Sequence, residues 1–190
     1  MKKKIIPFNG SESSYGRDYK LEHTERESKR NIESTDIWLY LGADVVDKNF
    51  AKIGITMGDL ASRSYSSSRP TYYLFCAFKF KCNVSAQEVK RVEVDVLSRI
   101  DGLHRNKDGS SKRMVHCESG VPSECFYPVE FFAFFKDLHD EIYDHHRGSF
   151  VISGYENECG VEDGEFVDCI FSPLQERRHN EYRKMILRYD

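Results

Sequence analysis

The sequence predicts an α+β protein, with strands that pair as antiparallel hairpins and with several helices. Apolar residues alternate with polar ones through 36–43 and 50–56, a pattern typical of half-buried strands. Apolar residues recur at helical spacing through 85–100 and 128–147. At 190 residues, the chain is long enough for one core or for a small domain with an appended lobe.

The first two strands are expected to pair as a hairpin around the turn Asp44–Asn49. Their apolar face would consist of Ile37, Leu39, Leu41, Ala51, Ile53 and Ile55. Because side chains alternate along a strand, Tyr40, Lys52 and Gly54 would then share the opposite face. A glycine on that face lets a ligand or a phosphate approach the backbone closely.

A short helix over Gly58–Tyr65 and a third strand over Tyr72–Lys81 are expected next, joined by a loop that contains Arg69. The third strand is rich in aromatic residues and alternates in the same way as the first two. With the first two strands, these elements would complete a small sheet with a short helix beside it.

The following helix is predicted to begin at Ser85 and to end near Ile100, with a capping box formed by Ser85 and Glu88. Its helical phase places Glu93 in the middle of an apolar stripe. That stripe is Val89, Val92, Val96, Leu97 and Ile100. A carboxylate there costs several kcal/mol unless it is paired, solvated or bound to a metal, so Glu93 is a candidate functional residue.

The remaining elements are a polar loop over Gly102–Lys112, a short strand near Ser123–Tyr127 and a C-terminal series. That series comprises a helix over 128–147, a β-hairpin from Ser149–Tyr155 and Glu165–Phe171, and a helix from Ser172 to about Tyr189.

Composition divides the chain into a flexible polar arm (1–33), a central domain (34–127) and an acidic C-terminal extension packed on that domain (128–190). Residues 36–116 hold thirteen Lys and Arg against nine Asp and Glu, whereas residues 117–190 hold seven against sixteen. The basic part is therefore the one suited to a polyanion.

No apolar run approaches the length of a membrane span, and MKKKIIPFNG lacks the apolar core of a secretory signal. The six cysteines form no CxxC pair, so we expect reduced thiols and a cytoplasmic location. His116, Cys117 and Cys125 are candidate zinc ligands, although their spacing differs from that of common zinc fingers. His139 and His146 are a second candidate metal pair, and both also suit a polar helix end.

Tyr40, Lys52, Arg63 and Glu93 together suit phosphodiester cleavage with one divalent metal ion. The nearby Lys52 charge would lower the pKa of Tyr40, which as a phenolate or polarised phenol could take a proton from water, and Arg63 could neutralise charge on the scissile phosphate. Glu93 could hold Mg²⁺, with water completing its coordination. Each residue taken alone also has an ordinary packing or surface role.

These motifs, in their order along the chain, resemble the GIY-YIG nuclease superfamily. The segments that show this resemblance are LYLG, AKIGIT, the Ser-Arg pair at 62–63 and the Val-Glu pair at 92–93. The closest branch is the one in which YIG becomes KIG, common in phages and mobile elements. SECF at 123–126 resembles an element that follows the catalytic helix in that branch, so the resemblance covers about residues 36–127.

The resemblance implies a small three-stranded antiparallel sheet flanked by helices, and DNA cleavage that depends on Mg²⁺ (or Mn²⁺). Tyr40 matches the tyrosine of GIY, Lys52 the first position of YIG and Gly54 its glycine. Arg63 matches the helix arginine, and Glu93 matches the metal-binding glutamate.

Three positions depart from the family pattern. Trp38 occupies the glycine position of GIY, Lys52 replaces the second tyrosine, and the histidine often found after the arginine falls at Ser67. These departures bear on activity more than on fold.

We therefore expect a Mg²⁺-dependent DNA endonuclease. Its predicted substrate-binding residues are Gly54, Arg69, Arg105, Lys107, Lys112 and Arg113. A catalytically weak nucleic-acid-binding regulator and a protein-interaction module that uses the acidic C-terminal part remain open, as do monomer and homodimer.

Overall fold

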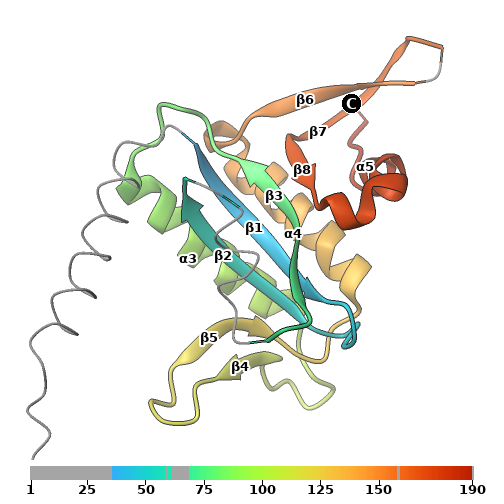
Figure 1. Ribbon diagram of the computed structural model, residues 1–190. Coiled ribbons are helices and arrows are strands. Elements are labelled where there is room, and N and C mark those ends of the chain that lie inside the picture. Colours follow the sequence, from blue (N-terminus) through green and yellow to red (C-terminus); the bar gives the residue numbers. More distant parts are fainter. Residues whose placement is uncertain (1–35, 59, 61–68, 158, 190) are drawn as a thin grey trace, which may run out of the picture. The chain divides into compact units, whose positions relative to one another are not determined.

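The computed structural model describes residues 36–58, 60, 69–157 and 159–189, all within the compact unit Thr35–Asp190. Arg63 and most of the helix predicted over Gly58–Tyr65 lie outside the described residues, as does the N-terminal arm. Within the described part, three α-helices accompany one six-stranded sheet and a separate hairpin, which confirms the α+β class (Figure 1).

The central sheet is antiparallel and has six strands, so the expected number of three is wrong. Its order is β4 (Arg113–Val115), β5 (Pro122–Phe126), β2 (Ala51–Met57), β1 (Ile37–Asp44), β3 (Tyr72–Lys79) and β8 (Cys169–Phe171). The predicted strands β1, β2 and β3 form its centre. Of the additional strands, β5 matches the short strand predicted near Ser123–Tyr127, β4 was not predicted, and β8 comes from a segment assigned to the C-terminal hairpin.

The register between β1 and β2 confirms the predicted hairpin and its two faces. Leu39 faces Ile55, Tyr40 faces Gly54 and Gly42 faces Lys52 across the ladder. The predicted apolar face packs into the main core, while Trp38, Tyr40, Leu74 and Ala77 form a second, smaller cluster on the other face.

Two helices cover the main apolar face of the sheet, α3 (Ala86–Leu103) and α4 (Phe131–His146), and Figure 1 shows both on the same side. The Ser85 hydroxyl accepts the Glu88 N–H and caps α3, but the Glu88 carboxylate bonds Arg91 instead of completing the capping box. Helix α4 begins at Phe131 because the Glu130 carboxylate accepts the first free N–H groups of the helix. Burying these two apolar faces makes α3 and α4 the principal cover of the core.

The C-terminal part splits into more elements than the sequence predicts. A short 3₁₀ turn, η1 (Arg147–Ser149), precedes the hairpin of β6 (Ile152–Glu156) and β7 (Glu162–Val167), and η2 (Pro173–Arg178) leads into α5 (His179–Met185). The expected strand over Glu165–Phe171 is interrupted at Asp168, whose N–H and C=O bond Val151 and Lys79. The break sends β8 to the edge of the central sheet, beside β3.

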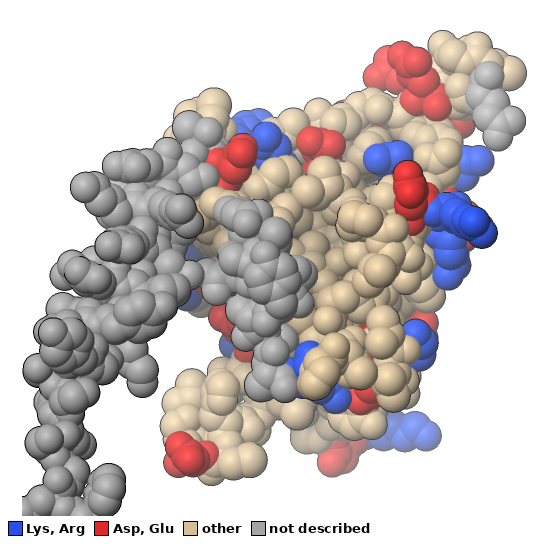
Figure 2. Space-filling view, viewed as in Figure 1, with Lys and Arg blue, Asp and Glu red and all other residues tan. Residues whose placement is uncertain are grey.

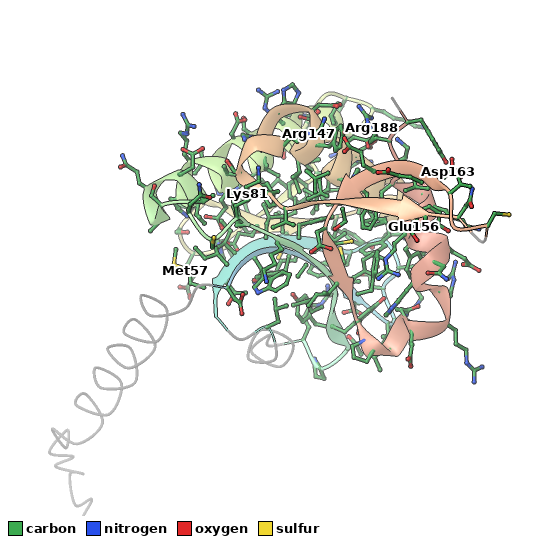
Figure 3. All side chains as sticks on the ribbon, turned by 90° about the horizontal axis from the view of Figure 1, so that it is seen from above. Met57, Lys81, Arg147, Glu156, Asp163 and Arg188 are labelled. Carbon is green, nitrogen blue, oxygen red and sulfur yellow. The ribbon has the colours of Figure 1, made fainter. Side chains whose placement is uncertain are left out.

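The end of the hairpin remote from the sheet is acidic and exposed, as Figure 2 shows. Its side chains include Glu156, Glu162 and Asp163. At the other end, Arg147 and Arg188 both stack on the Tyr143 ring, at 4.9 and 5.2 Å, and Figure 3 shows them near each other.

No helix among the described residues has the length and apolar character that crossing a bilayer requires.

Candidate functional site

Tyr40 lies directly over Gly54, its partner across the β1–β2 ladder. A Cβ added to Gly54 would stand 2.5 Å from the Tyr40 hydroxyl oxygen. The space above this glycine therefore accommodates the tyrosine ring, not the ligand that the sequence suggested. Tyr40 is 4% exposed and packs beside Trp38 and Leu74. This packing sets the direction of its hydroxyl on the Lys52 face of the sheet.

Lys52 lines an open cleft of about 680 Å³ on the same face as Tyr40. Arg69, also predicted to bind substrate, lines this cleft, and its guanidinium lies 4.3 Å from the centre of the Phe50 ring. Ion pairs to Asp44 and Asp47, at 3.5 and 3.6 Å, hold Arg69 in place. The fold thus brings two predicted cations to one surface hollow.

The rest of the cleft wall comes from the β4–β5 hairpin. It includes Met114, Val115, His116, Cys125 and Tyr127. Three of these, Met114, Val115 and Tyr127, are exposed apolar side chains, and burial raises the pKa of the Cys125 thiol. The wall therefore offers apolar and aromatic surface beside the two cations.

Glu93 is buried within the apolar stripe of α3, as its helical phase predicts, with 5% of its surface exposed. Its carboxylate accepts a hydrogen bond from the Lys90 ammonium at 2.5 Å. The hydrogen bond from this ammonium to Glu93, together with the carboxylate charge, raises the pKa of Lys90. A cation one turn earlier on α3 thus compensates the cost of burying the carboxylate.

Glu124 connects this ion pair to Lys52. Its carboxylate lies 3.7 Å from the Lys52 ammonium, and its charge also acts on Lys90. Ion pairs thus join Glu93 to Lys90 on α3 and Glu124 of β5 to Lys52 of β2, and the Glu124 charge helps to raise the pKa of Lys90, so the four residues form a series of alternating charges. Sequence reasoning missed Lys90 and Glu124, although Lys90 stands three residues before Glu93 and Glu124 lies within the SECF element.

The four predicted substrate-binding cations in and next to the polar loop Gly102–Lys112 differ in exposure and in their partners. Lys107 is exposed, whereas Arg105 is paired with Asp101 at 3.1 Å. Lys112 is half-buried, and the half-buried Arg113 donates a hydrogen bond to the Ser123 carbonyl, which fastens β4 to β5. None of these four cations is among the residues that line the cleft.

No group of three or more His, Cys, Asp or Glu side chains suited to a metal ion occurs among the described residues. Of the three zinc candidates, His116 and Cys125 line the cleft and Cys117 is exposed. His146 bonds Asp95 of α3 at 2.9 Å, and His139 is buried with its Nε2 accepting the Val167 N–H at 3.0 Å. Both histidines therefore hold elements of the fold together.

Glu93 is the carboxylate that the sequence predicts as the metal ligand, and it is buried and paired with Lys90. A divalent cation there would have one protein oxygen from Glu93 and would take the place of the Lys90 ammonium, which already balances two carboxylates. Such a donor set suits Mg²⁺, which commonly keeps several waters and binds through one or two carboxylates plus substrate phosphate.

No protein family, curated protein or solved structure matches this chain.

Proposed function

We propose that this protein is a Mg²⁺-dependent endonuclease that cleaves DNA at the junction of β2, β5 and α3. The observation that carries this proposal is the series Glu93–Lys90–Glu124–Lys52, which links the candidate metal ligand to the candidate catalytic lysine. The GIY-YIG resemblance of residues 36–127 supports the same assignment.

The cleft supplies the surface for the DNA backbone. Lys52 and Arg69 would bind phosphate oxygens, and Arg69 enters the reaction already held by two aspartates. A restrained guanidinium loses little side-chain freedom on binding, so it positions a phosphate efficiently.

The chemical step would use Tyr40 and Lys52. The Tyr40 hydroxyl stands above Gly54, the next residue on the Lys52 face of β2. As a phenolate, Tyr40 would take the proton of an attacking water, while the Lys52 ammonium would stabilise negative charge on the phosphate. Tyr40 is buried and does not line the cleft, so the water would have to reach it from the Lys52 side. Glu93 would hold Mg²⁺, which supplies Lewis-acid stabilisation of the phosphoryl oxygens when bound. Arg63 remains a predicted contributor.

A nucleic-acid-binding regulator is the second candidate, and one observation favours it. The Lys90 ammonium already neutralises Glu93 at 2.5 Å, which is a complete arrangement without a metal ion. In that case the cleft would bind DNA and the carboxylate would serve only the fold.

The test is a paired measurement of binding and cleavage on labelled duplex DNA, in EDTA and then in Mg²⁺ or Mn²⁺. We expect binding in EDTA and cleavage only with the metal. Arg69→Ala should weaken both by roughly tenfold, as expected for loss of a charge-assisted phosphate contact. Lys184→Ala removes an exposed lysine outside the cleft and is the matched control. Binding without cleavage under every metal condition would reject the nuclease in favour of the regulator.

A further inference from the structure

A second, more enclosed pocket of about 270 Å³ lies on the other side of the β1–β2 turn. It shares Phe50 with the cleft. Its lining includes Lys48, Tyr73, Phe132, Gln175, Arg178 and Tyr182. The last three come from η2 and α5, so the C-terminal part of the chain completes this pocket.

The polar wall of the pocket is built around the Gln175 amide. The Tyr182 hydroxyl donates a hydrogen bond to Gln175 Oε1 at 3.0 Å, and the Tyr73 side chain also bonds Gln175. Because Oε1 accepts from Tyr182, the N–H₂ group is the donor of this amide; one of its two N–H bonds serves Tyr73 and the other is left for a ligand. A fixed amide between two tyrosines can recognise the hydrogen-bonding edge of a planar ligand.

Aromatic rings and a cation form the adjoining wall. The Phe132 and Tyr182 rings stack at 5.7 Å, and the Arg178 guanidinium lies 5.6 and 5.0 Å from their centres. Arg178 is exposed and pairs with Glu181 at 2.8 Å. Phe132 and Tyr73 are half-buried, so part of each ring is open to a ligand.

Two cations, Lys48 and Arg178, lie at the rim of the pocket. Lys48 is exposed and forms no ion pair with any described residue. The two carboxylates in the lining are already engaged with backbone donors. Asp44 accepts the N–H groups of Val46 and Asp47, and Glu130 caps α4. Lys48 therefore remains for a ligand, and Arg178 could exchange its exposed pair with Glu181 for a phosphate, because an exposed ion pair contributes little.

From this arrangement we propose that the pocket binds a nucleobase that carries a phosphate. The base would enter beside Tyr73 and Phe132 with its edge toward Gln175, and the phosphate would lie at the rim between Lys48 and Arg178. A volume of about 270 Å³ is slightly below the usual range for ligand pockets, and it suits a base whose phosphate stays outside at the rim. The ligand can be a free mononucleotide or one nucleotide of a DNA strand that occupies the neighbouring cleft.

The test is isothermal titration of the full chain with AMP, adenine and ribose 5-phosphate, all in EDTA, where cleavage plays no part. We expect AMP to bind more tightly than either fragment. Lys48→Ala should weaken AMP binding by roughly fivefold and leave adenine binding unchanged. Arg178→Ala should weaken AMP binding at least as much, because it also removes the cation over the Phe132 ring. Arg177→Ala is the matched control, because Arg177 is exposed on the same turn but does not line the pocket.

Two results would overturn the proposal. One is failure of the wild-type chain to bind both AMP and a single-stranded oligodeoxyadenylate at millimolar concentration. The other is equal binding of AMP and ribose 5-phosphate, which would mean that the base is not recognised. Where AMP binds, displacement by the oligodeoxyadenylate assigns the pocket to a DNA strand, and lack of displacement assigns it to a free nucleotide. Because no cleavage is measured, failure here is separate from failure of the nuclease assignment.

Discussion

The Tyr40 ring lies over the backbone of Gly54, with its hydroxyl oxygen 2.5 Å from the place where a Cβ would stand. Since Tyr40 is nearly fully buried, the ring has little room to move away. The glycine of the KIG motif thus positions the tyrosine of the preceding strand on the Lys52 face.

Replacement of Gly54 by alanine should destabilise the protein by about 1–3 kcal/mol, the usual cost of overpacking a filled site. Urea denaturation of Gly54→Ala, Tyr40→Ala and the double variant measures this. If the contact is the cause, the double variant should be less destabilised than the sum of the single changes. Strict additivity would show that the two residues are independent.

Removing the Lys90 charge should let cleavage proceed at a lower Mg²⁺ concentration, because the ammonium competes with the metal ion for Glu93. In Lys90→Met, the Mg²⁺ concentration for half-maximal cleavage should fall roughly fivefold, corresponding to about 1 kcal/mol of lost competition. Arg91→Met is the control, since Arg91 pairs with Glu88 instead. A requirement for more Mg²⁺ in Lys90→Met would contradict the assignment of Glu93 as the metal ligand.

Stability should fall as the pH drops below about 6.5, the ordinary pKa of histidine. Burial lowers the pKa of His139, so the folded protein keeps this ring neutral while the unfolded chain takes up a proton. Protonation of Nε2 would also remove the acceptor for the Val167 N–H. Burial also lowers the pKa of His104, so this histidine likewise makes stability fall as the pH drops.

Urea midpoints between pH 5 and 7.5 check this dependence on pH. His139→Gln removes the titrating ring and retains a hydrogen-bond acceptor, so its midpoint should vary less with pH than that of the wild type, with His104 accounting for part of the remainder. An equally steep fall in His139→Gln would exclude His139 as a source of the effect.

Two glycine replacements should act in opposite directions. Gly164 has a φ of +93°, and a Cβ there would stand 2.7 Å from the Arg188 carbonyl oxygen, so Gly164→Ala should destabilise by about 1–3 kcal/mol. Gly102 lies near the end of α3 with open space around it, so Gly102→Ala should stabilise by up to about 1 kcal/mol. Thermal denaturation of both variants provides the comparison, and a neutral Gly164→Ala would refute the close contact with Arg188.

Local periodicity was sufficient to predict the parts of the fold that depend on neighbouring residues. The two faces of β1 and β2 and the burial of Glu93 follow from periods of 2.0 and 3.6 residues. These periods suffice to put Tyr40 and Lys52 on the same face of the sheet.

Pairing between distant segments could not be predicted in the same way. Strand β4 has three residues in a polar stretch, and β8 separates from β7 because Asp168 bonds Val151 and Lys79. The role of Glu124 depends on β5 lying next to β2, a contact between segments about seventy residues apart. The pocket around Gln175 likewise requires η2 to reach the β1–β2 turn.

The most direct test of the nuclease assignment is incubation of supercoiled plasmid with Mg²⁺ and the wild-type protein, Glu93→Gln or Tyr40→Phe. Glu93→Gln keeps the size of the side chain and removes its charge, and Tyr40→Phe keeps the ring over Gly54 and removes the hydroxyl. We expect nicking or linearisation by the wild type and at least a hundredfold slower reaction in both variants, as for loss of a general base or a metal ligand. Equal rates in all three proteins would contradict the account.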